Sequence, residues 1–215
     1  MTTPPPPRRR RPAAPWLFLA IGVTGLALVM LYLGPQAFGA RTEPLDRYVR
    51  AWAMGTESRL LERFGRLLTN AGTPVVLYVL GGLAALLLLW RRGWRAAVAM
   101  ATAPLLALTL HNLAKDHFER ARPPGGVVHE STSFPSGHAT SSAAVLVSLA
   151  YTLWRERLLP PAAAVLLGVA GPLLIAWSRI RVDAHWATDV IAGWSLGLIV
   201  AGVCGVVHRR LVKGG

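Results

Sequence analysis

Charged residues are scarce in this chain of 215 residues: they make up 15% of it, and only ten are aspartate or glutamate. A soluble domain carries about 25% charged residues, so the composition argues against an ordinary soluble domain. Apolar residues make up 53% of the chain and gather in long runs. Runs of this kind are typical of a protein whose chain crosses the bilayer several times.

Cysteine is almost absent, since Cys204 is the only one in the chain. A single cysteine excludes a disulfide within the chain and a cysteine metal site. Cys204 lies inside an apolar run, where we expect a small packing residue. Gly193 and Gly197 in the same run form a small-residue face suited to close helix packing within the fold. The carboxylates show no spacing that resembles a metal cage, so we expect neither a metal nor another cofactor.

Positive charge is in excess, because 23 lysines and arginines give a formal net charge of +13. In a soluble protein this excess would suggest a nucleic-acid partner. Here about half of the basic residues fall in short segments that alternate with apolar runs, which is the pattern of a topology signal. We therefore expect contacts with membrane lipids and no nucleic-acid partner.

Six apolar runs are long enough to cross a bilayer as helices. They cover residues 16–33, 74–90, 96–113, 138–154, 158–177 and 186–207. A signal peptide is an alternative for the first run, although a signal core usually has only about 7–15 residues. The sequence thus predicts an all-α, polytopic membrane protein with one six-helix domain over residues 16–207.

The two ends of the chain differ from this domain in composition. Residues 1–15 are rich in proline and arginine, which predicts a disordered tail, and residues 208–215 form a short basic tail. Between the first two runs, over residues 41–70, apolar residues recur at helical spacing among arginines. This pattern predicts one or two amphipathic helices on the membrane surface, with packing on other helices of the protein as an equal alternative.

Six spans place both ends of the chain on one side of the membrane. The basic turns at 91–95 and 155–157 then share that side with both tails, and the positive-inside rule makes it cytoplasmic. The loops at 34–72, 114–137 and 178–185 fall on the outer face. These loops also carry basic residues, so the charge asymmetry is incomplete. The Arg- and Ala-rich composition favours a bacterial cytoplasmic membrane.

A histidine and an aspartate spaced four residues apart open the last run. On a helix, His185 and Asp189 would share one face, and the carboxylate could accept the Nδ1–H of the imidazole. Nε2 would then act as a nucleophile or as a base, and the residues alone leave both roles open. Asp183 is a competing carboxylate, but we expect it to precede the helix. Arg179, just upstream, offers a guanidinium suited to phosphate oxygens.

The fourth run begins with a polar helix start. Pro135 blocks a helix before it, Ser136 is a typical N-cap, and Gly137 lets a ligand approach the backbone closely. Free N–H groups and the positive end of the helix dipole favour an oxyanion there. His138 lies in the first turn, beside such an anion. An ordinary serine cap without a ligand is the alternative.

Three cations on the outer face, Lys115, Arg122 and Arg179, could surround one anion. A phosphoryl group in its transition state spreads negative charge over three oxygens, and fixed donors can stabilise this charge. For any one of these cations, contact with lipid headgroups is the alternative. Arg120 and Arg181 could either tune the site or face water, and we favour water.

Three motifs follow one another along the chain: Lys-x6-Arg-Pro at 115–123, Pro-Ser-Gly-His at 135–138 and Ser-Arg-x5-His-x3-Asp at 178–189. They resemble, in residues and in order, the three-part signature of the type-2 phosphatidic acid phosphatase superfamily. This superfamily includes membrane lipid phosphate phosphatases and, more distantly, vanadium haloperoxidases. Every signature position matches, and the six-span layout resembles the bacterial membrane members over nearly the whole chain.

The resemblance implies a role for each matched residue. His185 would attack phosphorus and form a phosphohistidine, Asp189 would orient and polarise it, and His138 would protonate the leaving oxygen and then activate water. The remaining matched residues would bind the substrate phosphate: Lys115, Arg122, Ser136, Gly137 and Arg179. No metal is needed in such a mechanism.

The implied substrate is a lipid phosphate or diphosphate. Candidates are polyprenyl diphosphate, phosphatidylglycerophosphate and phosphatidic acid, and an outward-facing site favours the polyprenyl carrier. Phosphoryl transfer to an acceptor other than water is an alternative, whereas haloperoxidase chemistry is disfavoured because those relatives are soluble. A non-catalytic lipid-phosphate binder or transporter is a further alternative, against which both histidines and the lack of ionisable groups in mid-span argue. The sequence does not specify an oligomeric state.

Overall fold

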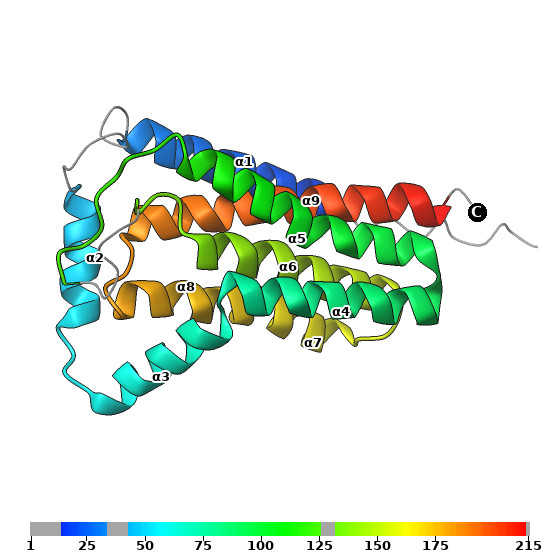
Figure 1. The fold of residues 1–215 in the computed structure, drawn as a ribbon, viewed down its shortest axis with the longest axis horizontal. Coiled ribbons are helices and arrows are strands. Elements are labelled where there is room, and N and C mark those ends of the chain that lie inside the picture. The colour runs from blue at the N-terminus through cyan, green and yellow to red at the C-terminus, as the bar shows by residue number, and fades with distance from the viewer. Residues whose placement is uncertain (1–13, 34–42, 126–131, 214–215) are drawn as a thin grey trace, which may run out of the picture.

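Helices make up all of the regular structure in the parts of the chain that the computed structural model describes, residues 14–33, 43–125 and 132–213. Most of them run along the long axis of the molecule (Figure 1). The start of α1 (Ala14–Leu33) lies beside the end of α9 (Ala187–Lys213), where Gly205 packs against Pro15. Both described ends of the chain therefore lie at one end of the bundle. Of the predicted disordered tail over residues 1–15, all but the last two residues fall outside the described residues.

Five helical stretches are long and apolar enough to cross a membrane. They are Ala14–Leu33, Pro74–Arg92 (α4), Trp94–Lys115 (α5), Pro161–Arg181 and Ala187–Leu211. Gly93, with a φ of 85°, permits the tight reversal between α4 and α5. The stretch 161–181 comprises α7 (Pro161–Val165), a π-helical turn η2 (Leu166–Ala170) and α8 (Gly171–Arg181). These stretches match five of the six predicted runs to within a few residues.

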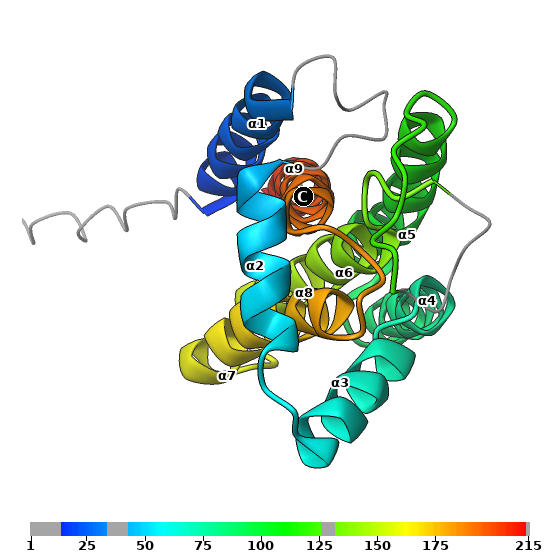
Figure 2. The same ribbon diagram turned by 90° about the vertical axis from the view of Figure 1, so that its left-hand side faces the viewer.

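The remaining predicted run forms α6 (Gly137–Arg155), which is not among the five stretches. This helix lies inside the bundle, against α4, α5, α8 and α9, and is buried along most of its length (Figure 2). A helix that faces other helices instead of lipid can carry serine and threonine, since these hydroxyls bond to its own backbone, as Ser141 does to Gly137. Its hydropathy is therefore low because of where it packs.

Close contact between α6 and α9 depends on two glycines. A Cβ on Gly193 would lie 2.5 Å from the carbonyl oxygen of Ser136, and one on Gly197 would lie 2.5 Å from that of Thr140. The small-residue face predicted for this run is thus used for packing within the fold. This packing holds the first turns of α6 and α9 side by side.

Two amphipathic helices, α2 (Pro44–Met54) and α3 (Arg59–Ala71), form over the predicted segment. Ser58 caps α3 by accepting a hydrogen bond from the amide of Leu61. Figure 2 shows α2 lying across one end of the bundle, where it contacts α8 and α9, while α3 packs beside α8. Both helices thus pack on other helices of the protein, which was one of the two predicted arrangements.

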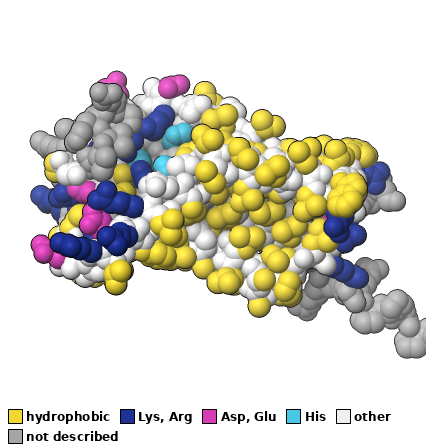
Figure 3. All heavy atoms as spheres, turned by 60° about the horizontal axis from the view of Figure 1, so that its bottom comes forward, with side chains coloured by type: hydrophobic (Ala, Val, Ile, Leu, Met, Phe, Trp, Pro, Cys, Tyr) yellow, Lys and Arg dark blue, Asp and Glu magenta, His cyan; other side chains and the backbone are white. Residues whose placement is uncertain are grey.

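The surface is divided along the long axis of the molecule. Figure 3 shows apolar side chains covering the middle of one face, with Lys and Arg side chains gathered at both ends. A bilayer would cover such an apolar band and leave the charged ends in water.

Candidate active site

The predicted site residues meet at the end of the bundle that α2 covers. Lys115 ends α5, Gly137 begins α6, Arg179 lies in the last turn of α8, and Asp189 lies in the first turn of α9. His185 lies in the turn just before α9. The structure therefore brings the three sequence motifs together, with the rings of His138 and His185 at the same end of the bundle.

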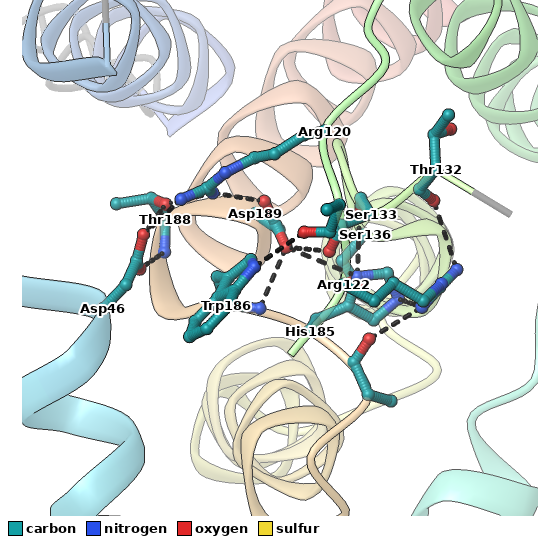
Figure 4. Close-up of polar contacts among 12 residues, drawn as sticks. Asp46, Arg120, Arg122, Thr132, Ser133, Ser136, His185, Trp186, Thr188 and Asp189 are labelled. Carbon is teal, nitrogen blue, oxygen red and sulfur yellow. Dashed lines mark hydrogen bonds and ion pairs between the residues drawn. The ribbon is translucent and has the colours of Figure 1, made fainter. Parts of the chain in front are cut away.

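His185 is 4% exposed and its imidazole is held at both ring nitrogens. Nδ1 lies 2.8 Å from the carbonyl oxygen of Ser133, and Nε2 lies 3.2 Å from Nη1 of Arg122 (Figure 4). Burial lowers the pKa of His185 to about 4, although Asp189 acts in the opposite direction. Near neutral pH the ring is therefore uncharged, with its Nδ1–H donated to Ser133 and a lone pair on Nε2.

Asp189 pairs with His185, as predicted, but the two residues do not pair across one face of a helix. α9 begins only at Ala187, so His185 does not share a helical face with Asp189, and Nδ1 is 3.7 Å from the carboxylate oxygen Oδ2. The nearer partner of Nδ1 is the backbone of Ser133. Sequence reasoning could not find this contact, since any residue can supply a backbone carbonyl.

Asp189 is fully buried and accepts hydrogen bonds at both oxygens. Arg120 donates to Oδ1 over 2.6 Å, the amide of Trp186 donates to Oδ2 over 2.9 Å, and the hydroxyl of Ser133 also donates to Oδ2. Several donors of this kind stabilise a carboxylate in its charged form. Asp189 thus holds the turn that carries His185 and places negative charge beside the imidazole.

The prediction that Arg120 faces water is wrong, because its side chain is 1% exposed. Its guanidinium bridges Asp189 and Asp46, and Asp46 lies on α2. Asp46 and Arg120 are 74 positions apart in the chain. Only the docking of α2 over this end of the bundle removes Arg120 from water, and no local pattern signals that docking.

Asp183 precedes α9, as predicted, and has a partner of its own. Arg50 of α2 donates to both of its carboxylate oxygens, over 2.6 and 2.7 Å. Arg181, expected to face water, donates to the backbone carbonyl of Thr56 at the surface. Asp183 is thus committed to α2 and does not compete with Asp189 for His185.

The three predicted cations lie at the same end of the bundle as His185. Lys115 and Arg122 both donate to the carbonyl oxygen of Thr132, over 2.8 and 3.2 Å. Arg179 is 6% exposed and donates from Nη1 to the hydroxyl of Thr69 on α3, over 3.2 Å. Burial lowers the pKa of Arg122, because its charged form loses solvation. Arg179 is thus buried, whereas Lys115 and Arg122 are half-buried.

Several buried polar atoms around this site have no hydrogen-bond partner within the described part of the chain. They are the hydroxyl of Ser136, Nε2 of His138, Nε of Arg179 and Nδ1 of His111. Ser136 occupies the N-cap position of α6, as predicted, yet its hydroxyl makes no capping bond. His138 is close enough to Arg179, Arg122 and His185 to interact with their charges. Since buried polar groups are nearly always bonded, such a cluster indicates a ligand site.

Two cavities flank this cluster. One of about 620 Å³ is lined by Arg50, Arg122 and Trp186, and the other, of about 570 Å³, by Thr69, Arg179 and Asp183 among others. Two of the three predicted cations, Arg122 and Arg179, thus each line a cavity at the covered end of the bundle.

Positive charge at the site comes from side chains. Among the residues that the structure describes, no group of three or more His, Cys, Asp or Glu is arranged to hold a metal ion. An uncharged imidazole at the same end of the bundle as one buried and two half-buried cations suits phosphoryl chemistry, in which negative charge on oxygen must be stabilised. Fold and site together define a membrane-embedded enzyme of the phosphoryl-transfer class.

Comparison with known proteins makes this class specific. The family model of the PAP2 superfamily matches residues 92–213, and the chain belongs to this superfamily. The resemblance inferred from the three motifs is thereby confirmed. The match covers the helices that carry all three motifs.

Two curated relatives are enzymes that act on lipid phosphates. The chain is 27% identical to the undecaprenyl-diphosphatase of Sulfolobus acidocaldarius over 85% of both chains. It is 38% identical to phosphatidylglycerophosphatase B of Bacillus subtilis over 42% of this chain and 47% of that protein. The chain is accordingly a lipid phosphatase.

Two solved structures share the fold. A transmembrane PAP2-type phosphatidylglycerolphosphate phosphatase from Bacillus subtilis superposes with a TM-score of 0.66, at 22% identity, over 94% of this chain and 98% of that one. LpxE of Aquifex aeolicus superposes with a TM-score of 0.58, at 20% identity, over 78% and 96%. Together with the five apolar helical stretches, these matches identify an integral membrane protein.

Proposed function

We propose that this enzyme hydrolyses a lipid phosphate or diphosphate in two steps, without a metal, through a phosphohistidine at His185. The observation that carries the proposal is the buried imidazole of His185, with Nδ1 held by a carbonyl and Nε2 directed toward Arg122. An imidazole fixed in one tautomer, uncharged and next to cations, is an activated nucleophile for phosphorus.

In the first step Nε2 of His185 attacks phosphorus, and the P–O bond to the leaving group breaks. His138 gives its proton to the leaving oxygen. In the second step His138 takes a proton from water, the water oxygen attacks phosphorus, and the P–N bond breaks to release phosphate. The cationic imidazole of the intermediate is stabilised by Asp189, 3.7 Å from Nδ1.

We propose that the groups predicted from the motifs bind the phosphate oxygens. Lys115, Arg122 and Arg179 supply positive charge, and the hydroxyl of Ser136 and the backbone at Gly137 supply donors at the start of α6. The unpaired Oγ of Ser136 and Nε of Arg179 support this role, because both can bond to the anion. Metal independence follows from these cations, which stabilise the transition-state charge that a metal ion would otherwise stabilise.

We propose polyprenyl diphosphate as the substrate. The relative that matches over 85% of both chains is named for this activity. Phosphatidylglycerophosphate is the second candidate, because the phosphatidylglycerophosphatase B of Bacillus subtilis has the higher identity, 38%, over its shorter match. Both are lipids whose anionic headgroup reaches the covered end while the tail stays in the bilayer.

The proposed placement in the membrane has six spans, with α6 as the sixth, inside the other five. The site then lies on the extracytoplasmic face, since the basic turns at 91–95 and 155–157 lie at the opposite end of the bundle. α2 and α3 lie at the interface, and exposed apolar side chains such as Tyr48, Trp52 and Leu60 support this placement.

Phosphate release from a panel of purified lipid phosphates, in detergent, tests the proposal. We expect release by the wild type to persist in EDTA and to be fastest with polyprenyl diphosphate, and His185→Ala to abolish it. Arg63 is an exposed cation on α3, and Arg63→Gln is the control for the loss of one positive charge. Activity of His185→Ala within a few-fold of the wild type would exclude the nucleophile, and loss of activity in EDTA would exclude the metal-free mechanism.

A further inference from the structure

Arg120 lies within the first motif segment but is not one of the matched positions, which are Lys115, Arg122 and Pro123. Its side chain is nevertheless among the most deeply buried in the described part of the protein, at 1% exposure. Burying a guanidinium is costly unless it is paired and hydrogen-bonded. The contacts that offset this cost connect Arg120 to the catalytic end of α9.

The contacts form a chain of three charged groups (Figure 4). Nη1 of Arg120 donates to Oδ1 of Asp189 and to the hydroxyl of Thr188, each over 2.6 Å, while Nη2 donates to Asp46. Asp46 also accepts from the amide of Thr188 over 2.9 Å and from its hydroxyl over 2.8 Å. Asp46 and Asp189 are both 0% exposed. A fork of donors is needed to serve two carboxylates at once, and arginine has it while lysine does not.

We propose that Arg120, held in place by Asp46 of α2, is a positioning residue that orients Asp189 and sets the negative charge that Asp189 presents to His185. This inference rests on the proposed role of His185 as the nucleophile. By occupying Oδ1, Arg120 turns Oδ2 toward the amide of Trp186 and the imidazole. By pairing with Arg120 from the other side, Asp46 prevents the guanidinium from neutralising Asp189 completely.

Other charged groups also act on His185, and the test must separate them from Arg120. The titratable and charged groups that face it come from α5, the following loop, α6, α8 and α9: His111, Arg122, His138, Arg179 and Asp189. Among the described residues, the hydrogen bonds of Arg120 go to Asp189, Thr188 and Asp46 and not to the imidazole. Its effect passes through Asp189, so a change at Arg120 should alter the charge felt by His185 without altering contacts to the phosphate.

Two substitutions with opposite electrostatic effects give the test. Arg120→Gln removes the positive charge that is paired with Asp189, so we expect the acidic limb of kcat/KM to move to higher pH. We also expect kcat to fall by about 10- to 100-fold, because Asp189 is no longer held in position. KM should stay within about two-fold of the wild type, because Arg120 does not bind substrate. Asp46→Asn removes the negative charge that competes with Asp189 for Arg120, so Arg120 neutralises Asp189 more completely. The acidic limb of kcat/KM should therefore move to lower pH. Arg120→Lys should recover part of the lost kcat.

The controls separate this inference from the proposed function. Phosphate release by the wild type and none by His185→Ala show that the proposed function holds. Arg63→Gln should match the wild type in kcat, KM and pH profile. Two outcomes would overturn the positioning role. One is an Arg120→Gln variant whose kcat and acidic limb of kcat/KM equal those of the wild type. The other is a shift of the acidic limb in the same direction for Arg120→Gln and for Asp46→Asn. If size-exclusion chromatography shows that Arg120→Gln is misfolded, the direction of the limb in the isosteric Asp46→Asn decides alone.

Discussion

The protonation state and orientation of the His185 imidazole are set by the groups around it. In water an imidazole has a pKa of about 6.5 and is partly charged at neutral pH. Here burial keeps it uncharged, Ser133 fixes the proton on Nδ1, and Arg122 faces Nε2. These contacts provide the tautomer that an attack on phosphorus requires.

The low pKa of His185 predicts the pH range of activity. Nε2 has no lone pair when the ring is protonated, so kcat/KM falls as the pH drops through the pKa of His185 in the free enzyme. Because that pKa is lowered to about 4, we expect the acidic limb due to His185 to lie well below pH 6.5. Phosphate release measured as a function of pH checks this prediction. The substrate's own ionisation, titrated by 31P NMR in the same micelles, is the control, and a corrected limb centred at 6.5 would contradict the prediction.

At the scale of the elements, the site depends on how closely α6 and α9 approach each other. His138 lies in the first turn of α6, and Asp189 lies in the first turn of α9. Gly193 and Gly197 let the two helices touch through their backbones. The separation between the two catalytic segments is therefore set by residues that carry no chemistry of their own.

Gly197→Ala should weaken this contact and lower the thermal midpoint of unfolding. The added Cβ would meet the carbonyl oxygen of Thr140 at 2.5 Å and the Cβ of Ala143 at 2.6 Å, so the helices must separate. Overpacking of this kind typically costs about 1–3 kcal/mol. Gly82→Ala on α4 is the matched control, because nothing lies within 4 Å of the new Cβ. A midpoint for Gly197→Ala equal to or above that of Gly82→Ala would argue against the contact.

At the scale of the whole molecule, one end of the bundle is covered by α2 and carries the candidate site, whereas the opposite end carries the basic turns. α2 crosses the covered end and makes two polar contacts near the start of α9: Asp46 bonds to Thr188 in the first turn of α9, and Arg50 pairs with Asp183 in the turn before it. The two charged ends are separated by the apolar band of Figure 3. A bilayer around this band would place the two ends in different compartments.

Labelling of single cysteines tests this placement. With Cys204→Ser as background, Glu57→Cys lies between α2 and α3, and Arg155→Cys ends α6 at the other end; both positions are exposed. We expect a membrane-impermeant maleimide to label Glu57→Cys from outside intact cells and Arg155→Cys only in inverted vesicles. Unsubstituted protein should remain unlabelled, because Cys204 is 2% exposed. Labelling of both cysteines from the same side would refute the six-span placement.

Residue patterns alone are enough to predict the helical class, the approximate extent of the long helices and the three motifs of the site. Membrane-spanning helices can be recognised in a sequence because the thickness of the bilayer fixes their length and requires them to be apolar. The motifs are legible because phosphate chemistry needs histidine and cations at set positions. Even α6, which is less apolar than the five stretches long and apolar enough to cross a membrane, is predicted as a helix, because its second half is apolar and a basic turn follows it.

The partners of the predicted site residues follow from how the helices pack, and not from the residue pattern. The carbonyl of Ser133 replaced Asp189 as the nearest acceptor for His185, and Arg120, expected in water, proved to be buried between Asp46 and Asp189. A backbone carbonyl can come from any residue type, so the sequence does not indicate which carbonyl will accept a hydrogen bond. The pairing of Arg120 with Asp46, 74 positions away, depends on where α2 docks. Burial and long-range pairing are properties of the packed bundle, so no local pattern contains them.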